Sequence, residues 1–198
     1  MNTLKQLGMK KEWIYEIILS SFSNDIPRAA PFGVKTSDFK YVRFALYKGS
    51  HTLENILDHR EFVINVVQDM DIVYDALYAK DKLKYGLALK INAPILNDAP
   101  ANIEVKLTST ASKNQLVAVE AEIVHVQINK PCIPINRAKN LLLESLIIAT
   151  RVSYLPEGRA VELLKENNRV IKKVAPGSKY AAMMEELLIK FGFGPNRC

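Results

Sequence analysis

The chain has 198 residues, of which 48% are hydrophobic and 24% are charged, and its formal net charge is +6. These values are typical of a soluble globular protein with one domain, or one domain and an appendage, and they exclude a chain that needs disulfides or a metal to fold. No unbroken apolar run follows the first residues, so we expect no signal peptide and no membrane span. Cys132 and Cys198 form no ligand pair, and a reduced, cytoplasmic setting is the simplest expectation.

The basic balance is compatible with a nucleic acid, an anionic cofactor or no particular partner. The lysines are spread along the chain, and their densest stretch, Lys165 to Lys179, is interpreted as a solvated surface. The three histidines, His51, His59 and His125, lack the spacing of metal ligands, so we expect no metal site. The sequence contains no Walker loop, nucleophile elbow or dinucleotide fingerprint.

Segments rich in β-branched and aromatic residues dominate the first two thirds of the chain. We expect strands over 12–22, 41–47 and 62–67, and a hairpin of 101–110 and 115–128. Small residues and prolines over 27–34 predict an extended segment that another group approaches closely. A short helix is expected up to about Arg60, and 69–77 is expected to be partly helical.

The last third of the chain has helical spacing instead. Asn136 is a plausible N-cap for a helix over 137–153, a second helix runs from 157 to about Lys172, and a third from about Lys179 ends at Gly192. This order predicts an α+β fold, with a mainly antiparallel β-domain over residues 1–134 and a helical unit over 135–198.

The segment after Tyr47 offers groups that suit an anion. Gly49 frees the backbone to turn, Ser50 and Thr52 supply hydroxyls, and Lys48 adds charge. The backbone N–H groups at a helix start favour an anion, and Asn55 lies one turn beyond His51 and Thr52 on the same face. These groups together predict a phosphate site. The alternative is that the two hydroxyls merely cap a connecting helix.

Five groups of short motifs are spread along the chain. They are Glu16-Ile17-Ile18, PRAAPFGV over 27–34, YKGSHTLEN over 47–55, Val63–Val66 with Asp69, and Asn136–Ala138 with Glu144 and Ala149–Arg151. This set, which extends from about Trp13 to Phe193, resembles an archaeal family of unknown function related to the flavin reductases. One departure is Arg28, where the resemblance leads us to expect a smaller polar residue such as Asn.

The resemblance implies an FMN-binding split barrel that forms a homodimer, with the FMN near the interface between the two copies. The phosphate would be held by the loop that starts at Gly49, and the flavin ring would lie along Ala29–Val34, where small residues let backbone N–H groups reach the ring edge. The cofactor-binding residues expected in these two segments are Ala29, Ala30, Pro31, Phe32, Gly33, Val34, Lys48, Gly49, Ser50, His51, Thr52 and Asn55.

Four further polar residues are candidates for the same cofactor. Asn65 and Asp69 follow the next strand and would face the ribityl chain, unless they serve only turn chemistry. Arg137 and Arg151 begin and end the first C-terminal helix. Either arginine would reach the flavin phosphate or the pyrimidine edge, unless it is simply solvated or salt-bridged.

We therefore expect a flavin-dependent oxidoreductase that takes a hydride from a reduced nicotinamide or deazaflavin donor, with no protein residue as an obligatory acid or base. The first alternative is a non-enzymatic FMN carrier or redox sensor, because the same loop serves both. The second is a nucleic-acid-binding barrel, whose charge would cluster on one face among exposed aromatic residues. Tyr41, Phe44 and Tyr47 have instead the spacing of mostly core residues, so we expect no nucleic-acid partner.

Overall fold

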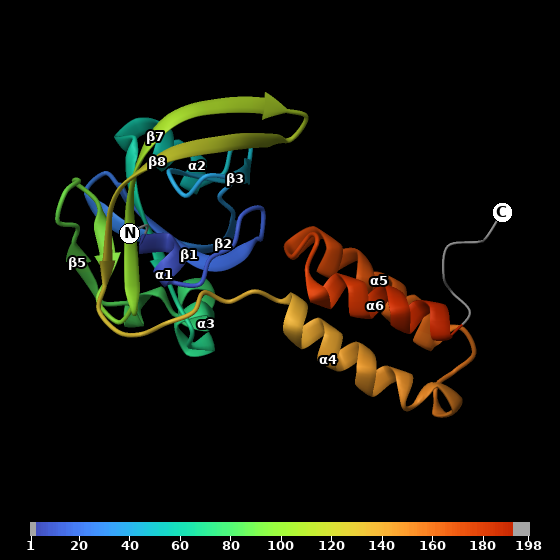
Figure 1. Cartoon of the computed structure of the whole chain (residues 1–198). Coiled ribbons are helices and arrows are strands. Elements are labelled where there is room, and N and C mark those ends of the chain that lie inside the picture. Colours follow the sequence, from blue (N-terminus) through green and yellow to red (C-terminus); the bar gives the residue numbers. More distant parts are fainter. Residues whose placement is uncertain (1–2, 192–198) are drawn as a thin grey trace. The chain divides into compact units, whose positions relative to one another are not determined.

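The computed structural model of the protein describes residues 3–191, so the helix end expected at Gly192, the limit of the resemblance at Phe193 and the terminal Cys198 lie outside the described residues. The described chain forms two compact units (Figure 1). One contains the residues up to Lys11 together with Tyr15–Ile135, and the other contains Glu12–Ile14 together with the residues from Asn136 onward. Each unit is described in turn.

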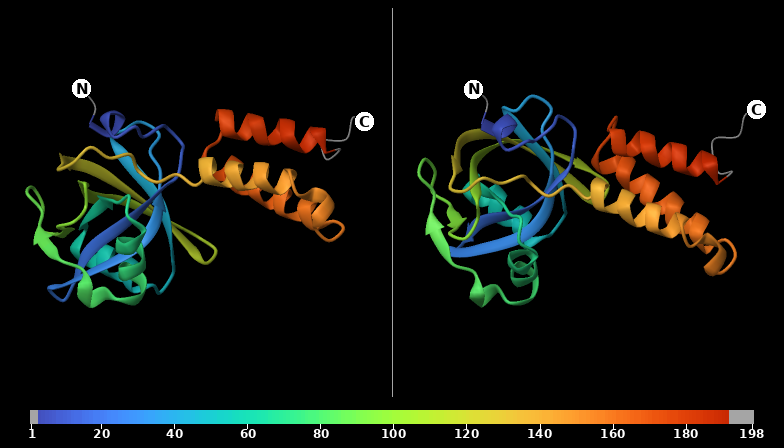
Figure 2. Two further views of the ribbon diagram at one scale, coloured as in Figure 1. Left: turned by 90° about the horizontal axis from the view of Figure 1, so that it is seen from below. Right: turned by 60° about the horizontal axis from the view of Figure 1, so that its bottom comes forward.

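The first unit is built on six antiparallel strands. They are β1 (Tyr15–Ser23), β2 (Ile26–Val34), β3 (Tyr41–Tyr47), β4 (Glu61–Val66), β7 (Ala101–Lys113) and β8 (Leu116–Ile128), in the sheet order β2-β1-β4-β7-β8-β3. The sheet is curled, as the views in Figure 2 show, and an isolated bridge between Lys35 and Arg43 links the ends of its two edge strands. The result is a half-barrel, which confirms the predicted antiparallel β-domain.

The edge position of β2 explains how a strand with two prolines pairs at all. Pro27 lies opposite Phe22 and Pro31 opposite Ile18 in the ladder with β1. Proline has no N–H to donate, so it is tolerated on a strand that has a neighbour on one side only. The extended segment predicted for 27–34 is therefore a strand.

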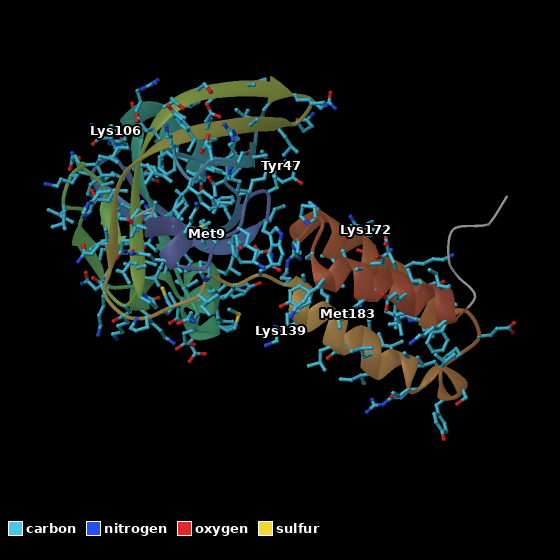
Figure 3. All side chains as sticks on the ribbon, viewed as in Figure 1. Met9, Tyr47, Lys106, Lys139, Lys172 and Met183 are labelled. Carbon is cyan, nitrogen blue, oxygen red and sulfur yellow. The ribbon has the colours of Figure 1, made fainter. Side chains whose placement is uncertain are left out.

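The core of the half-barrel is made of β-branched and aromatic side chains, among them Ile18, Phe62, Ile64 and Ile103, each fully buried. The side chains fill the inside of the curled sheet in Figure 3. Within β3, burial alternates with a period of two, so Val42, Phe44 and Leu46 face the core. Tyr47 faces the other side and is 70% exposed (Figure 3), so its expected core position is wrong: a spacing of three residues cannot keep one face of a strand.

Short elements complete this unit. The helix α2 (His51–His59) packs Leu53 and Ile56 against the sheet, and its C-cap Arg60 has a left-handed backbone. The predicted partly helical stretch is α3 (Met70–Tyr78). The remaining elements were not predicted from the sequence, namely α1 (Thr3–Gln6), the 3-10 helix η1 (Lys80–Lys82) and the two-stranded sheet of β5 (Tyr85–Leu87) and β6 (Pro94–Leu96).

The second unit holds the three predicted helices, α4 (Ala138–Ala149), α5 (Arg159–Val174) and α6 (Lys179–Lys190), with a 3-10 turn η2 (Val152–Tyr154) after the first. Leu142, Leu164, Ile171 and Met184 form its buried core. Trp13 and Ile14, far away in the sequence, pack against the same cluster. No helix in the described part of the chain has the length and hydropathy to cross a membrane.

Asn136 has a larger role than the predicted N-cap. Its side-chain oxygen accepts a hydrogen bond from the Ala138 backbone N–H at 3.0 Å, as a cap would. Its side-chain amide also donates to the backbone oxygens of Ile14 and Val174, both at 2.8 Å. One residue therefore fixes the start of α4, the end of α5 and the segment before β1.

Candidate functional site

A pocket of about 320 Å³ opens on the half-barrel beside the first turn of α2. Three elements and one residue of η1 supply its walls, which are lined by Leu19, Ser21, Ser23, Arg28, Ala29, Ala30, His51, Thr52, Asn55 and Lys80. Five of these residues belong to the set predicted from the sequence, namely Ala29, Ala30, His51, Thr52 and Asn55. The structure thus brings the two predicted segments, 29–34 and 48–55, to one pocket.

The turn into α2 is built as the sequence indicates. Gly49 has a φ of 72°, and a Cβ at this position would meet no atom within 4 Å, so the requirement for glycine is conformational. Ser50 is the N-cap, and its side chain accepts a hydrogen bond from the Leu53 backbone N–H at 3.4 Å. Lys48, Gly49 and Ser50 do not line the pocket. The hydroxyl that caps the helix and the one that faces the pocket are therefore different, Ser50 and Thr52.

Strand alternation decides which residues of β1 face the pocket. Leu19, Ser21 and Ser23 are each two residues apart, so their side chains lie on one face of the strand. Ser20, on the other face, is saturated by hydrogen bonds to Pro94 and Asn65. Ser21 is only 1% exposed, yet its hydroxyl makes no hydrogen bond to any described residue. Because Ser21 lines the pocket, its hydroxyl is available to a ligand or to water there.

The other polar side chains of the pocket also lack protein partners, with the exception of His51, among the described residues. No side-chain hydrogen bond or ion pair within the described residues involves the polar residues Ser23, Thr52 and Asn55. The same holds for the two cations, Arg28 and Lys80. The His51 Nδ1 lies 3.3 Å from Glu54 Oε2, and the His51 side chain is 98% exposed. The lining includes no Asp or Glu, so the pocket is positively charged.

Arg28 also acts electrostatically on Tyr85 in the short strand β5. Burial raises the pKa of the Tyr85 phenol, and the positive charge of Arg28 opposes this rise. Arg28 stands where the resemblance leads us to expect Asn, and this departure is the signal that the sequence contains for it. No pattern in the sequence marks Lys80, Ser21 or Ser23 as residues of the pocket.

Residues 15–130 match the model described as the N-terminal domain of a protein of unknown function, DUF447, and residues 136–188 match the second DUF447 model. The chain belongs to the DUF447 family. The predicted resemblance to an archaeal family of unknown function is thereby confirmed.

This DUF447 protein is 28% identical to an uncharacterized protein of Methanocaldococcus jannaschii, in an alignment 193 positions long that covers 89% of this chain and 97% of the relative. An FMN-bound DUF447 protein from Methanosarcina mazei is similar in structure, with 25% identity, a TM-score of 0.55, and coverage of 94% of this chain and 98% of the other. A split-barrel protein from Shewanella frigidimarina, provisionally assigned as a flavin reductase, has 18% identity, a TM-score of 0.52 and coverage of 59% and 67%. The predicted split-barrel fold is confirmed.

Two predicted ligand residues of this DUF447 protein have structural tasks instead. Asn65 is fully buried, and its amide donates to the Ile18 backbone and to Ser20, while its oxygen accepts from Leu96 N and Asn102. All four hydrogen-bonding positions of the side chain are used within the sheet, which leaves none for a ribityl chain. Asp69 caps α3 by accepting from the Asp71 backbone N–H, the turn chemistry considered as the alternative.

The remaining predicted residues lie outside the pocket lining. Pro31, Phe32, Gly33 and Val34 continue β2 beyond Ala30, with Val34 fully buried. Arg137 and Arg151 belong to the helical unit, where they flank α4 and are exposed. Contact of either arginine with a flavin stays a prediction.

Proposed function

We propose that this DUF447 protein binds FMN non-covalently in the α2 pocket and acts as a flavin-dependent oxidoreductase. The observation that carries the proposal is a set of polar side chains, Ser21, Ser23, Arg28, Thr52, Asn55 and Lys80, that line one positively charged pocket and have no side-chain hydrogen bond or ion pair among the described residues. The Methanosarcina mazei member of the same family is FMN-bound, and its similarity extends over nearly the whole chain. FMN carries an anionic phosphate and several hydroxyl groups, and both kinds of group suit this polar, positively charged lining.

The residues of the pocket fit the parts of FMN one by one. Thr52 and the first-turn N–H groups of α2 suit the phosphate, because a helix start attracts an anion. Ser21, Ser23 and Asn55 offer partners for ribityl hydroxyls. Ala29 and Ala30 keep the β2 wall low, so a flat ring can lie against the strand. The volume of about 320 Å³ is in the range of small-molecule sites, which begins at roughly 300 Å³.

When bound, the flavin supplies the electron-transfer chemistry itself. The protein side chains bind and orient the cofactor, and the pocket lining holds no carboxylate that would act as a general acid or base. The identity of the electron donor is not encoded in these residues. The reduced nicotinamide or deazaflavin donor expected from the resemblance, the homodimer and the cytoplasmic location stay predictions.

The absorption spectrum of the protein tests the cofactor. The protein is incubated with FMN and desalted, and we expect it to retain the visible absorption bands of oxidised flavin. A protein that emerges colourless, with no saturable FMN binding in an equilibrium titration, would overturn the proposal.

Turnover distinguishes the enzyme from a non-enzymatic FMN carrier or redox sensor. The FMN-loaded protein is mixed anaerobically with reduced nicotinamide or deazaflavin donors, and the visible flavin absorbance is followed. Bleaching by one donor class, faster than that of free FMN, is the result expected of an oxidoreductase. If no donor bleaches the bound flavin faster than free FMN, the carrier or sensor is the better description.

A further inference from the structure

Two cations on different elements face the α2 pocket without a partner. Arg28 comes from the edge strand β2 and Lys80 from η1, and both are exposed. Neither side chain makes an ion pair or hydrogen bond within the described chain. Other cations of the same unit are paired: the Lys82 Nζ, two residues after Lys80, lies 3.8 Å from Asp75 Oδ1, and Arg43 forms an ion pair with Glu120. The pocket therefore concentrates positive charge that the protein itself does not neutralise.

We propose that Arg28 and Lys80 form a charge-selective subsite for a phosphate monoester, so that the protein binds phosphorylated flavin and discriminates against riboflavin. The inference rests on the proposed function and adds its determinants of specificity. A phosphate monoester carries close to two negative charges at pH 7, with a second pKa of about 6. Two unpaired cations beside a helix start match this dianion in charge.

The two cations contribute in different ways. The planar guanidinium of Arg28 can donate two parallel hydrogen bonds to a phosphate, whereas the Lys80 ammonium acts as a compact charge. The Ser21 hydroxyl faces the ribityl chain, which FMN and riboflavin share, so it does not distinguish the two flavins. Riboflavin lacks the phosphate, so binding of riboflavin leaves both cations without a ligand partner.

The inference also explains the departure at position 28. An Asn there, as the resemblance leads us to expect, would offer an amide to a ligand but no charge. The Arg therefore adds to the electrostatic part of the binding free energy. Because both cations are exposed, salt screens this part, with a Debye length of about 10 Å at 0.1 M ionic strength.

Parallel titrations with FMN and riboflavin, read by quenching of flavin fluorescence, test the subsite. The variants are Arg28→Asn and Lys80→Gln, and the matched control is Lys113→Gln, an exposed lysine at the end of β7 outside the pocket lining. We expect each pocket variant to bind FMN about tenfold more weakly than the wild type, which is the effect of losing one charge-assisted hydrogen bond. Riboflavin affinity and the control should stay within about twofold of the wild type. Added salt should weaken the binding of FMN and leave the binding of riboflavin unchanged.

The outcomes separate the two proposals. Equal affinities of the wild type for FMN and riboflavin, or pocket variants that bind FMN as the wild type does, would overturn the subsite and leave flavin binding intact. A wild-type protein that binds neither flavin would overturn both. If Arg28→Asn proves unfolded by circular dichroism, Lys80→Gln and the wild-type comparison of the two flavins still decide.

Discussion

The Ser50 hydroxyl accepts a hydrogen bond from the Leu53 backbone N–H at 3.4 Å, so the residue that precedes α2 is its cap. Thr52, two residues later, lines the pocket and has no side-chain partner within the described residues. The two hydroxyls, predicted as one phosphate-holding set, therefore have separate tasks. Ser50 fixes the helix start, and Thr52 lines the pocket.

Ser50→Ala is expected to act on stability. Loss of the N-cap acceptor should lower the free energy of unfolding by about 1 kcal/mol. Urea denaturation of the flavin-free protein measures this change, and FMN affinity of the folded variant should fall by less than about threefold. An unchanged unfolding midpoint together with a large loss of FMN affinity would show that Ser50 holds the phosphate after all.

Thr52→Val is expected to act on the ligand. Valine keeps the shape of the side chain and removes the hydroxyl, so FMN affinity should fall by about fivefold to tenfold, since a neutral hydrogen bond contributes about 1 kcal/mol. The unfolding midpoint should stay close to that of the wild type. Equal FMN affinity of variant and wild type in a fluorescence titration would remove Thr52 from the site.

The sequence was sufficient for most of the fold because its patterns are local. Alternation and β-branched residues marked the strands that became β1, β3, β4, β7 and β8, and helical spacing marked α4, α5 and α6. The short strands β5 and β6 were not predicted, because three residues are too few to show a period. The packing of Trp13 in the helical unit was not predicted either, since it joins residues far apart in the chain.

The candidate site divides in the same way. Ala29, Ala30, His51, Thr52 and Asn55 stand in contiguous motifs and could be predicted, whereas Ser21 and Lys80 join them only through the pairing of strands and the placement of η1. Asn65 is the opposite case. Its position after a strong strand pattern predicts a ligand residue or a turn residue, whereas four hydrogen bonds to other parts of the protein occupy its side chain.

Asn65→Ala is therefore expected to damage the fold and not the pocket. The change leaves the buried Ser20 hydroxyl, the Leu96 N–H and the Asn102 amide each without one hydrogen bond, at a cost of about 1–3 kcal/mol per unsatisfied group. Equilibrium unfolding in urea measures the loss, which should reach at least about 2 kcal/mol. A variant as stable as the wild type would contradict the network described for this residue.

Glu61 predicts a pH dependence of stability. The hydrogen bond from Lys106, at 2.8 Å, lowers the pKa of the Glu61 carboxyl, and the Asn92 N–H lowers it further (Figure 3 labels Lys106). A depressed pKa in the folded state contributes stability that is present above the ordinary glutamate range, near 4.3, and is lost as the pH falls through the folded value.

Glu61→Gln removes this charge and keeps an acceptor for Asn92. At pH 7 the variant should be less stable by up to about 1 kcal/mol, the usual limit for a partly exposed ion pair. The difference from the wild type should shrink as the pH is lowered toward 3, when urea unfolding is measured at both values. A difference that is constant across this range would mean that the charge of Glu61 has no part in stability.

The most direct test of the central claim, that FMN occupies the α2 pocket, is calorimetric titration of the wild type and of Ala30→Phe with FMN. Ala30 is a half-buried pocket residue on an edge strand, where a phenyl group fills the space beside α2 without entering the core. We expect saturable binding of one FMN per chain to the wild type and none to the folded variant. Wild-type affinity and stoichiometry in Ala30→Phe would contradict the pocket assignment.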